Sequence, residues 1–531
     1  MTSGHRTYRR HFALLLIVMI AQFFVSAQLR AGNEGHNIAG ISMARAFVAS
    51  ARGLEAIGTN PANLTLPYKG SAFEYKLERL TRDSLVEKSD SAGHTTYDVI
   101  QVKYDTLILT RETPPTVSFT LLPSFSFDFR TDFINYDIYN QYFTGVDDGT
   151  GNFVSRHLTD DDKNSILGLF PSGLAETHSN FDLRIFGLTI HNDFLGDIGL
   201  SITDHAAFNL DIPKDYLSIW LFGLDTLGSS YDLSGTNIRA WYLREYALTY
   251  ARNLPMVKFV KDFSAGFSFK IVHGYAVVMT DKYNATFGSH IGPNSIPTLD
   301  GNIDFRILRS QSDNFPQFHN SVGTVDQQQQ SSMSPFPTPA GTGFGVDLGV
   351  AGEIFNGIRA AISITDIGSI NWTANTMQTV GSKTFHMTNP TGGSQSDTLK
   401  DALNGKDTTA DAFSMPLPTS MRIGAAIHVD ELFWWPGHML VSIEYQQGFN
   451  TSPGNTTHPR LAVGAEWRLI PFLPLRSGVS FGGADRFNWA AGFGLDFGGF
   501  AWNFGTENIA LVATPHSYQQ LSFGMSMMVR I

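Results

Sequence analysis

The end of the chain alternates strictly between large apolar side chains and small or polar ones. The apolar set is Leu521, Phe523, Met525, Met527, Val529 and Ile531, and the intervening set is Ser522, Gly524, Ser526, Met528 and Arg530. A period of two places the two sets on opposite faces of a β-strand. The chain has no cysteine and contains many similar segments. The pattern therefore predicts the closing strand of an outer-membrane barrel, apolar toward lipid and polar toward the lumen.

The start of the chain predicts export. Arg6, Arg9 and Arg10 precede an apolar run over residues 12–25, and small residues end this region at Ala27. We interpret residues 1–27 as a removed signal peptide. The alternative is a retained anchor helix, but the run is shorter than the roughly 20 residues that span a bilayer.

Composition favours one large closed sheet over several soluble domains. The 531 residues show no linker between two halves, and charged residues make up only 16% while mean hydropathy is -0.07. These values suit a barrel whose apolar and polar faces average out. The net charge of -11 argues against a nucleic-acid partner. The lack of cysteine excludes disulfides and thiolate metal sites, and the scattered histidines suggest no zinc site or other cofactor.

Five further segments of the last third repeat the alternation, and each keeps its charges on one face. A Lys or Arg on the lipid face costs roughly 2 to 4 kcal/mol near mid-bilayer, so a barrel confines such residues to its interior or rim. The charges concerned are Arg422, Glu466, Arg468, Arg476 and Asp496. The alternative is a soluble sandwich with charged outer faces. We predict an all-β fold, a transmembrane antiparallel barrel of about 14 strands over residues 69–531.

The expected strands span residues 71–80, 116–129, 181–192, 196–203, 243–251, 263–280, 343–352, 358–364, 421–429, 441–446, 461–469, 475–481, 487–497, 499–504 and 521–531. Long polar stretches at about 284–342 and 381–413 are interpreted as mobile loops of the barrel.

Two small helical insertions are expected. Thr159 and the acidic residues after it form an N-terminal cap that leads into residues 164–170. Pro213 opens a second helix that is apolar almost all round and includes Trp220 and Phe222. This helix either lines an apolar passage or packs on a loop or at the membrane interface.

Three motifs carry a resemblance to a known family. They are Ala46-Phe47-Val48 followed by Asn60-Pro61-Ala62, the Asp-x-Gly strand pair at residues 345–349 and 364–368, and residues 462–468 with 474–476 and 491–495. Together they resemble the FadL/TodX-type outer-membrane transport superfamily and its PorV-like relatives. Residues 130–240 depart from typical transporters and resemble a longer branch from gram-negative bacteria.

The resemblance implies that residues 28–68 form a hatch inside the barrel, with Asn60, Pro61 and Ala62 as its motif. An Asn before a proline suits a turn, and a plain connecting turn is the alternative. Phe47, Trp220 and Phe222 are the candidate residues for binding an apolar ligand.

Enzyme signatures are weak. Gly478, Ser480 and Gly482 match a Gly-x-Ser-x-Gly pattern, but that motif needs a strand-to-helix turn and here lies inside an expected strand. Residues 147–152 have the composition of a cation-binding loop without the spacing of an EF-hand. We expect no catalytic residues and no metal site.

Three classes of function remain open. The first is an outer-membrane channel for small hydrophobic compounds, which buried apolar area alone can bind. The second is a PorV-like barrel that docks secretion-system or surface proteins through its long loops. The third is an outer-membrane hydrolase, which ranks last because no set of acid, base and nucleophile can be assembled.

Overall fold

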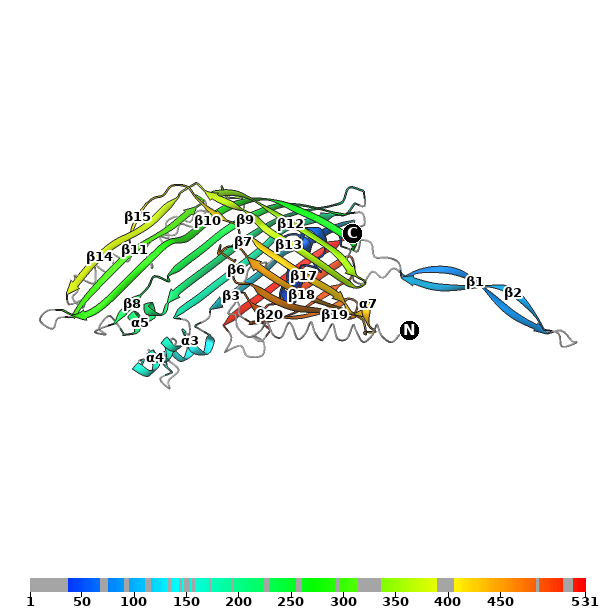
Figure 1. Ribbon diagram of the computed structural model, residues 1–531, viewed down its shortest axis with the longest axis horizontal. Helices are drawn as coiled ribbons and strands as arrows, with labels where there is room; N and C mark the ends of the chain where they lie inside the picture. The colour runs from blue at the N-terminus through cyan, green and yellow to red at the C-terminus, as the bar shows by residue number, and fades with distance from the viewer. Residues whose placement is uncertain are drawn as a thin grey trace.

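The computed structural model contains a closed, transmembrane antiparallel β-barrel (Figure 1). The structure describes residues 37–66, 75–89, 95–109, 116–131, 133, 135–142, 146–147, 153–154, 158–170, 173–192, 194–222, 229–254, 260–292, 297–313, 336–388, 405–483, 487–509 and 519–531. The expected signal peptide, residues 1–27, lies outside them. No helix within these ranges has both the length and the apolarity needed to cross a membrane.

Fourteen strands of the described chain form the ring that closes on itself, as the sequence predicted. The ring strands are β3 (Val117–Thr131), β6 (Leu174–Ile190), β7 (Asp197–Pro213), β9 (Asn237–Asn253), β10 (Lys261–Ile291), β12 (Gly341–Phe355), β13 (Ile358–Trp372), β17 (Ser420–His428), β18 (His438–Gly448), β19 (Arg460–Ile470), β20 (Leu473–Gly482), β21 (Phe487–Asp496), β22 (Phe500–Thr506) and β23 (Gln520–Arg530). Closure comes from β23, which pairs with β3.

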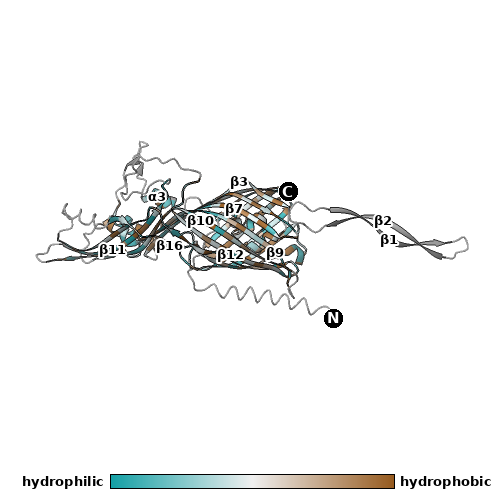
Figure 2. Cartoon of the chain, turned by 90° about the horizontal axis from the view of Figure 1, so that it is seen from above, coloured by the Kyte–Doolittle hydropathy of each residue, from teal (hydrophilic) through white to brown (hydrophobic). Residues whose placement is uncertain are grey.

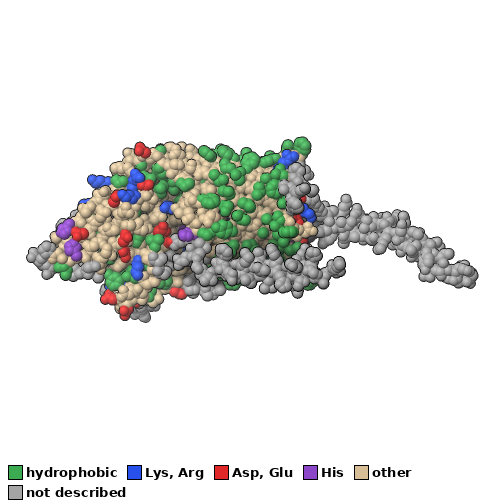
Figure 3. All heavy atoms as spheres, viewed as in Figure 1, with side chains coloured by type: hydrophobic (Ala, Val, Ile, Leu, Met, Phe, Trp, Pro, Cys, Tyr) green, Lys and Arg blue, Asp and Glu red, His purple; other side chains and the backbone are tan. Residues whose placement is uncertain are grey.

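The two faces of the ring are those that the alternation predicts. Val463 on β19, Leu475 on β20 and Phe523 on β23 are exposed. Ala462 and Ser522, which directly precede Val463 and Phe523 in the chain, are buried. Figure 2 shows hydrophobic and hydrophilic residues alternating along the ring strands, and Figure 3 shows hydrophobic side chains gathered over the ring. Strands β18 and β19 have 11 residues each, which suits a span of about 9 to 11 tilted residues.

The charges expected inside the barrel form ion pairs in the lumen near the ends of their strands. Arg468 lies 2.8 Å from Glu466 and 3.0 Å from Asp496, and Arg476 lies 2.6 Å from Glu466. Arg530 lies 3.1 Å from Asp496. Arg422 lies 3.8 Å from Glu444. Because each of the five expected charges has a partner on the inner face of the ring, none of them has to face lipid.

The two ends of the ring differ. Tight turns such as Asn356–Gly357 and residues 471–472 connect strands at the end where β23 finishes, which we call the short-turn end. Exposed aromatic side chains cluster in these turns, including Phe194, Phe355 and Trp434. Near this end lies α7 (Val429–Leu432). The longer connections lie at the opposite end.

At the long-connection end the sheet continues beyond the ring as an extension (Figure 1). Strand β10 has 31 residues, and its register shifts at the bulge between Gly274 and Ala276. Its second half pairs with β11, which in turn pairs with β14. The further strands of the sheet at this end are β8 (Ser230–Asp232), β11 (Pro297–Gln311), β14 (Met377–Thr388), β15 (Lys406–Thr409) and β16 (Phe413–Pro416). Charged side chains gather over the extension (Figure 3).

The extension corrects the interpretation of residues 284–342 and 381–413 as loops. Their described parts contain the end of β10, all of β11 and β15, and part of β14. An apolar cluster that includes Phe287, Leu299, Ile303 and Phe385 holds these strands together. The polar composition of these segments did not indicate strands, because only one face of this sheet is buried and the other carries polar side chains.

Both expected helices are present. Helix α4 (Asp160–Gly168) begins with a capping box between Thr159 and Asp162. Helix α5 (Lys214–Phe222) follows Pro213, the last residue of β7. Short elements nearby are α3 (Tyr136–Tyr142), β4 (Val146–Asp147) and β5 (Phe153–Val154).

The described part of the first expected strand, residues 75–80, is not part of the barrel. It lies in β1 (Tyr75–Ser89), which pairs with β2 (Thr95–Leu109) in a separate two-stranded sheet. The other fourteen expected segments coincide with the fourteen ring strands. Period-two alternation identifies a strand but not its partner, so it assigned this strand to the wrong sheet.

Candidate functional site

Residues 37–66, which we call the N-terminal segment, lie inside the ring (Figure 1). The segment contains α2 (Ile38–Ser42), η2 (Gly53–Ala56) and η3 (Pro61–Thr65), and nearly all of its residues are buried. Glu444 of β18 anchors it, because one carboxylate oxygen accepts hydrogen bonds from the backbone N–H groups of Phe47 and Val48, both at 2.7 Å. Arg184 of β6 donates to the carbonyl oxygens of Leu54 and Ile57 at 2.7 and 3.0 Å.

Glycines on the inner face of the ring make room for this segment. A Cβ atom added at Gly464 or at Gly478 would lie 2.5 Å from backbone atoms of Met43. Similar close approaches to the segment occur at Gly266, Gly349, Gly492 and Gly505. At Gly464, Gly478 and Gly266 the nearest atoms are backbone of the segment, so these positions exclude any side chain while the segment is in place.

The Asn-Pro-Ala motif forms the turn that its residues predict. The Asn60 side-chain oxygen accepts a hydrogen bond from Ala62 N–H at 3.1 Å, and Pro61 begins η3. The Asn60 amide group donates to the Val48 carbonyl oxygen at 3.3 Å and to that of Val350 on β12 at 3.4 Å. The motif therefore links two parts of the segment to the barrel wall. Its role as part of a hatch stays a prediction.

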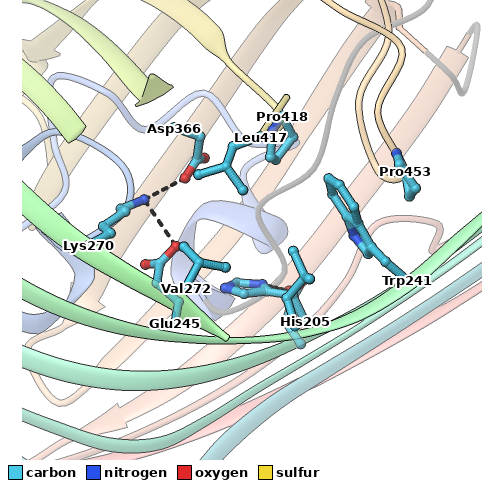
Figure 4. Close-up of a pocket in the computed structure, with 12 residues that line it drawn as sticks. His205, Trp241, Glu245, Lys270, Val272, Asp366, Leu417, Pro418 and Pro453 are labelled. Atoms are coloured by element: carbon cyan, nitrogen blue, oxygen red, sulfur yellow. Dashed lines mark hydrogen bonds and ion pairs between the residues drawn. The ribbon is translucent and has the colours of Figure 1, made fainter. Parts of the chain in front are cut away.

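A cavity of about 60 Å³ lies in the lumen beside Gly58 of the segment. One part of its wall is apolar, and the other part is charged (Figure 4). Its lining residues are Gly58, Asp182, His205, Trp241, Leu243, Glu245, Lys270, Val272, Asp366, Leu417, Pro418 and Pro453. These side chains come from five ring strands and two connections, so only closure of the barrel brings them together.

Lys270 is the centre of the charged wall. Its ammonium group lies 2.6 Å from Asp366, 3.0 Å from Asp347 and 3.3 Å from Glu245, and its side chain is 2% exposed. A buried charge requires such partners because desolvation is costly. His205 makes a further ion pair with Asp182 on the same wall.

An irregularity between β12 and β13 places Asp366. The register shifts between Val346 and Leu348, and the Asp366 N–H donates to the Asp347 side chain at 2.8 Å. Asp366 has a φ of 59°, a left-handed conformation that Asp tolerates better than most residues. Bulges of this kind redirect a side chain out of the regular alternation.

The apolar wall continues into a larger apolar cluster inside the barrel. Trp241, Leu243, Val272 and Leu417 belong both to the cavity lining and to this cluster. The fully buried Trp372 is another member. The cavity therefore lies at a boundary between a charged and an apolar part of the lumen.

The three predicted ligand residues are not brought together. Phe47 is buried in the N-terminal segment, in a cluster with Met43 and Ala51. Phe222 lies in α5, where the Lys163 ammonium group is 5.1 Å from the centre of its ring. Trp220 lies in the same helix, whose contacts are with α4, β7 and β8. Neither Phe47 nor Phe222 lines the cavity.

Sequence reasoning missed Lys270, Glu245 and His205 as site residues. It did single out Asp347 and Asp366, since both lie in the Asp-x-Gly strand pair. A lysine on the polar face of a strand was the available signal for Lys270. Its significance appears only when three carboxylates from other strands surround it.

The two other motifs considered in the sequence are the Gly-x-Ser-x-Gly match at Ser480 and the acidic stretch at residues 147–152. Ser480 is buried in β20, which continues into the strand β21 and not into a helix. Of the acidic stretch at residues 147–152, only Asp147 is among the described residues. Within the described ranges, no group of three or more His, Asp or Glu side chains is placed to hold a metal ion.

The chain resembles solved structures of toluene transporters and of a FadL homologue at low sequence identity. The Ralstonia pickettii toluene transporter TbuX is 10% identical, with 94% of this chain and 99% of that chain covered at a TM-score of 0.41. The Pseudomonas putida toluene transporter TodX is 10% identical, with coverage of 95% and 98% and a TM-score of 0.38. A Pseudomonas aeruginosa FadL homologue is 10% identical, with coverage of 94% and 98% and a TM-score of 0.37.

No curated protein matches the chain. A family model, described as a family of unknown function (DUF5723), matches residues 109–507. This match covers every ring strand except β23 and includes the cavity-lining strands. The chain therefore belongs to the DUF5723 family.

Proposed function

We propose that the protein is an outer-membrane channel for small hydrophobic compounds and that it is not an enzyme. The observation that carries this proposal is the lumenal cavity, which is lined both by apolar side chains and by Gly58 of the N-terminal segment. Cavities that combine an apolar lining with a few polar groups are the usual form of small-molecule sites.

The orientation follows from the two ends of the ring. Barrels of the outer membrane have short periplasmic turns, longer extracellular loops and aromatic girdles at the interfaces. We infer that the short-turn end, with Phe355 and Trp434, faces the periplasm. The extension, with its charged surface, then projects outside the cell (Figure 3).

The N-terminal segment acts in this proposal as a hatch. It fills the ring between the cavity and the short-turn end, and a limited set of polar contacts, such as those of Glu444 and Arg184, holds it there. A compound that enters from the extension reaches the cavity first. Movement of the segment then opens the path toward the periplasm.

An interruption of the barrel wall offers a second way out of the lumen. The β3–β6 register breaks between Phe119 and Ser124, around Pro123, which has no N–H to donate to a neighbouring strand. Leu121 and Leu122 are exposed on the outer surface at this point. Passage at this point would lead an apolar compound into the bilayer without crossing water.

The test is native mass spectrometry, with lipid extraction, of the full-length protein purified gently from outer membranes. The proposal expects an apolar small molecule bound at a defined stoichiometry. An empty barrel that arrives with a protein partner would contradict it and favour a docking function. Recovery of the protein from another compartment would contradict the outer-membrane location.

A further inference from the structure

The cavity beside Lys270 is poorly suited to a bare hydrocarbon. Its lining includes the apolar side chains of Trp241 and Val272, and Glu245, Lys270 and Asp366 lie next to them (Figure 4). A hydrocarbon placed against these groups would remove water from the charges and offer no hydrogen bond in return. We propose that the cavity binds the cationic amino group of a small amphipathic compound. This inference rests on the proposed channel function and specifies its substrate class.

The sign of the head group follows from the charges around the cavity. Three carboxylates, those of Glu245, Asp347 and Asp366, share the single ammonium group of Lys270 at distances of 3.3, 3.0 and 2.6 Å. His205 is paired with a fourth carboxylate, that of Asp182. The site therefore has more negative than positive charge, which attracts a cation and repels a carboxylate.

The hydrogen-bonding capacity of the cluster points the same way. Glu245 and Asp366 line the cavity, and their carboxylates lie 3.3 and 2.6 Å from the Lys270 ammonium group. Carboxylates only accept hydrogen bonds, whereas a primary ammonium group brings three donors. A ligand with donors thus complements the cluster better than a ligand that adds acceptors.

The size of the cavity limits what can enter it. Its volume is about 60 Å³, whereas an engineered apolar cavity that binds benzene has about 150 Å³. A small head group fits this volume, and the rest of a larger ligand extends beyond it. The apolar body of the ligand then lies toward the apolar cluster around Trp241 and Leu417, which borders the cavity.

Three probes of similar shape test the inference: benzylamine, toluene and benzoate. Their binding to the full-length protein in detergent is measured by isothermal titration calorimetry. We expect benzylamine to bind at least tenfold more tightly than toluene or benzoate. Glu245→Gln removes one carboxylate from the cluster and should weaken benzylamine binding at least tenfold while leaving toluene binding unchanged. Asp304→Asn makes the same change of charge in the extension and should alter neither.

The outcomes separate this inference from the proposed function. If toluene or benzoate binds as tightly as benzylamine, the amine inference is overturned while the channel function stands. If none of the three binds, the channel function itself is contradicted. If Glu245→Gln does not fold, Asp366→Asn serves instead, because it removes another of the carboxylates around the Lys270 ammonium group. It should also weaken benzylamine binding at least tenfold and leave toluene binding unchanged.

Discussion

Glu444 should hold the N-terminal segment in the barrel. This side chain is 1% exposed, and it accepts hydrogen bonds from the N–H groups of Phe47 and Val48 at 2.7 Å each. A hydrogen bond to a charged group contributes about 1.5 to 3 kcal/mol. Loss of both bonds in Glu444→Ala therefore costs about 3 kcal/mol at the lower end of that range. At 1.4 kcal/mol per tenfold change, the population with the segment released rises about 150-fold.

The absence of cysteine from the chain provides the assay. Ser50 is buried at 3% exposure, and its hydroxyl lies 3.3 Å from that of Ser442. In Ser50→Cys, the rate of reaction with a water-soluble maleimide reports how often the segment leaves the barrel. We expect this rate to rise by about two orders of magnitude when Glu444→Ala is added, in line with the 3 kcal/mol loss.

Two controls make the result interpretable. Glu353→Gln changes a carboxylate that accepts a hydrogen bond from the turn residue Gly357, so it should leave the labelling rate unchanged. Glu444→Gln keeps one carbonyl oxygen as an acceptor and should give an intermediate rate. An unchanged rate in Glu444→Ala, in protein that still forms a heat-resistant barrel, would refute the anchoring role.

Three further predictions concern the barrel wall and the segment. Val463→Lys places a charge on the lipid face and should cost roughly 2 to 4 kcal/mol, seen as loss of the heat-resistant band on gels, whereas Thr384→Lys in the extension should assemble normally. Gly478→Ala introduces a Cβ atom 2.5 Å from the segment and should raise the maleimide rate, whereas Gly288→Ala meets nothing within 4 Å and should not. Burial raises the pKa of Glu55 above its ordinary value of 4.5. Ionisation of Glu55 as the pH rises above that value therefore weakens the binding of the N-terminal segment inside the barrel. The maleimide rate, corrected for ionisation of the thiol, should increase with pH. Glu55→Gln should abolish this increase.

The structure also changes which controls suit the lipid-face test. From alternation alone, Gly464 is a neutral inward position and a natural match for Val463. In the fold, a side chain at Gly464 would meet Met43. A substitution there would thus disturb the segment, and its effect would not report on lipid exposure.

Much of the barrel was predictable because the bilayer imposes a simple rule. Every ring strand has one face toward lipid, and that face excludes charge. Arg422, Glu466 and Asp496 therefore had to point inward. Arg422 and Asp496 are buried, and Glu466 pairs with Arg468 and Arg476. The same rule identified the fourteen ring segments but not the extension, whose strands beyond the ring need no lipid-facing side.

The candidate site was much less predictable. Its charged wall joins Glu245 of β9, Lys270 of β10 and Asp366 of β13. These residues are separated by connections of different lengths, and no local pattern specifies which strands meet across the lumen. Phe222, chosen for its apolar helix, packs away from the cavity because α5 docks on the extension side of β7 and β8.

The amino-acid sequence by itself determined the fold class, the inner and outer faces of the strands, and the turn at Asn60, since each depends on local periodicity or on a residue and its neighbours. Only the tertiary structure decided that the first hairpin pairs apart from the barrel, that the presumed loops build an extension, and that three carboxylates converge on Lys270. The physical reason is that strand pairing and ring closure are long-range. Alternation specifies which way a side chain points, but closure of the sheet decides what it faces.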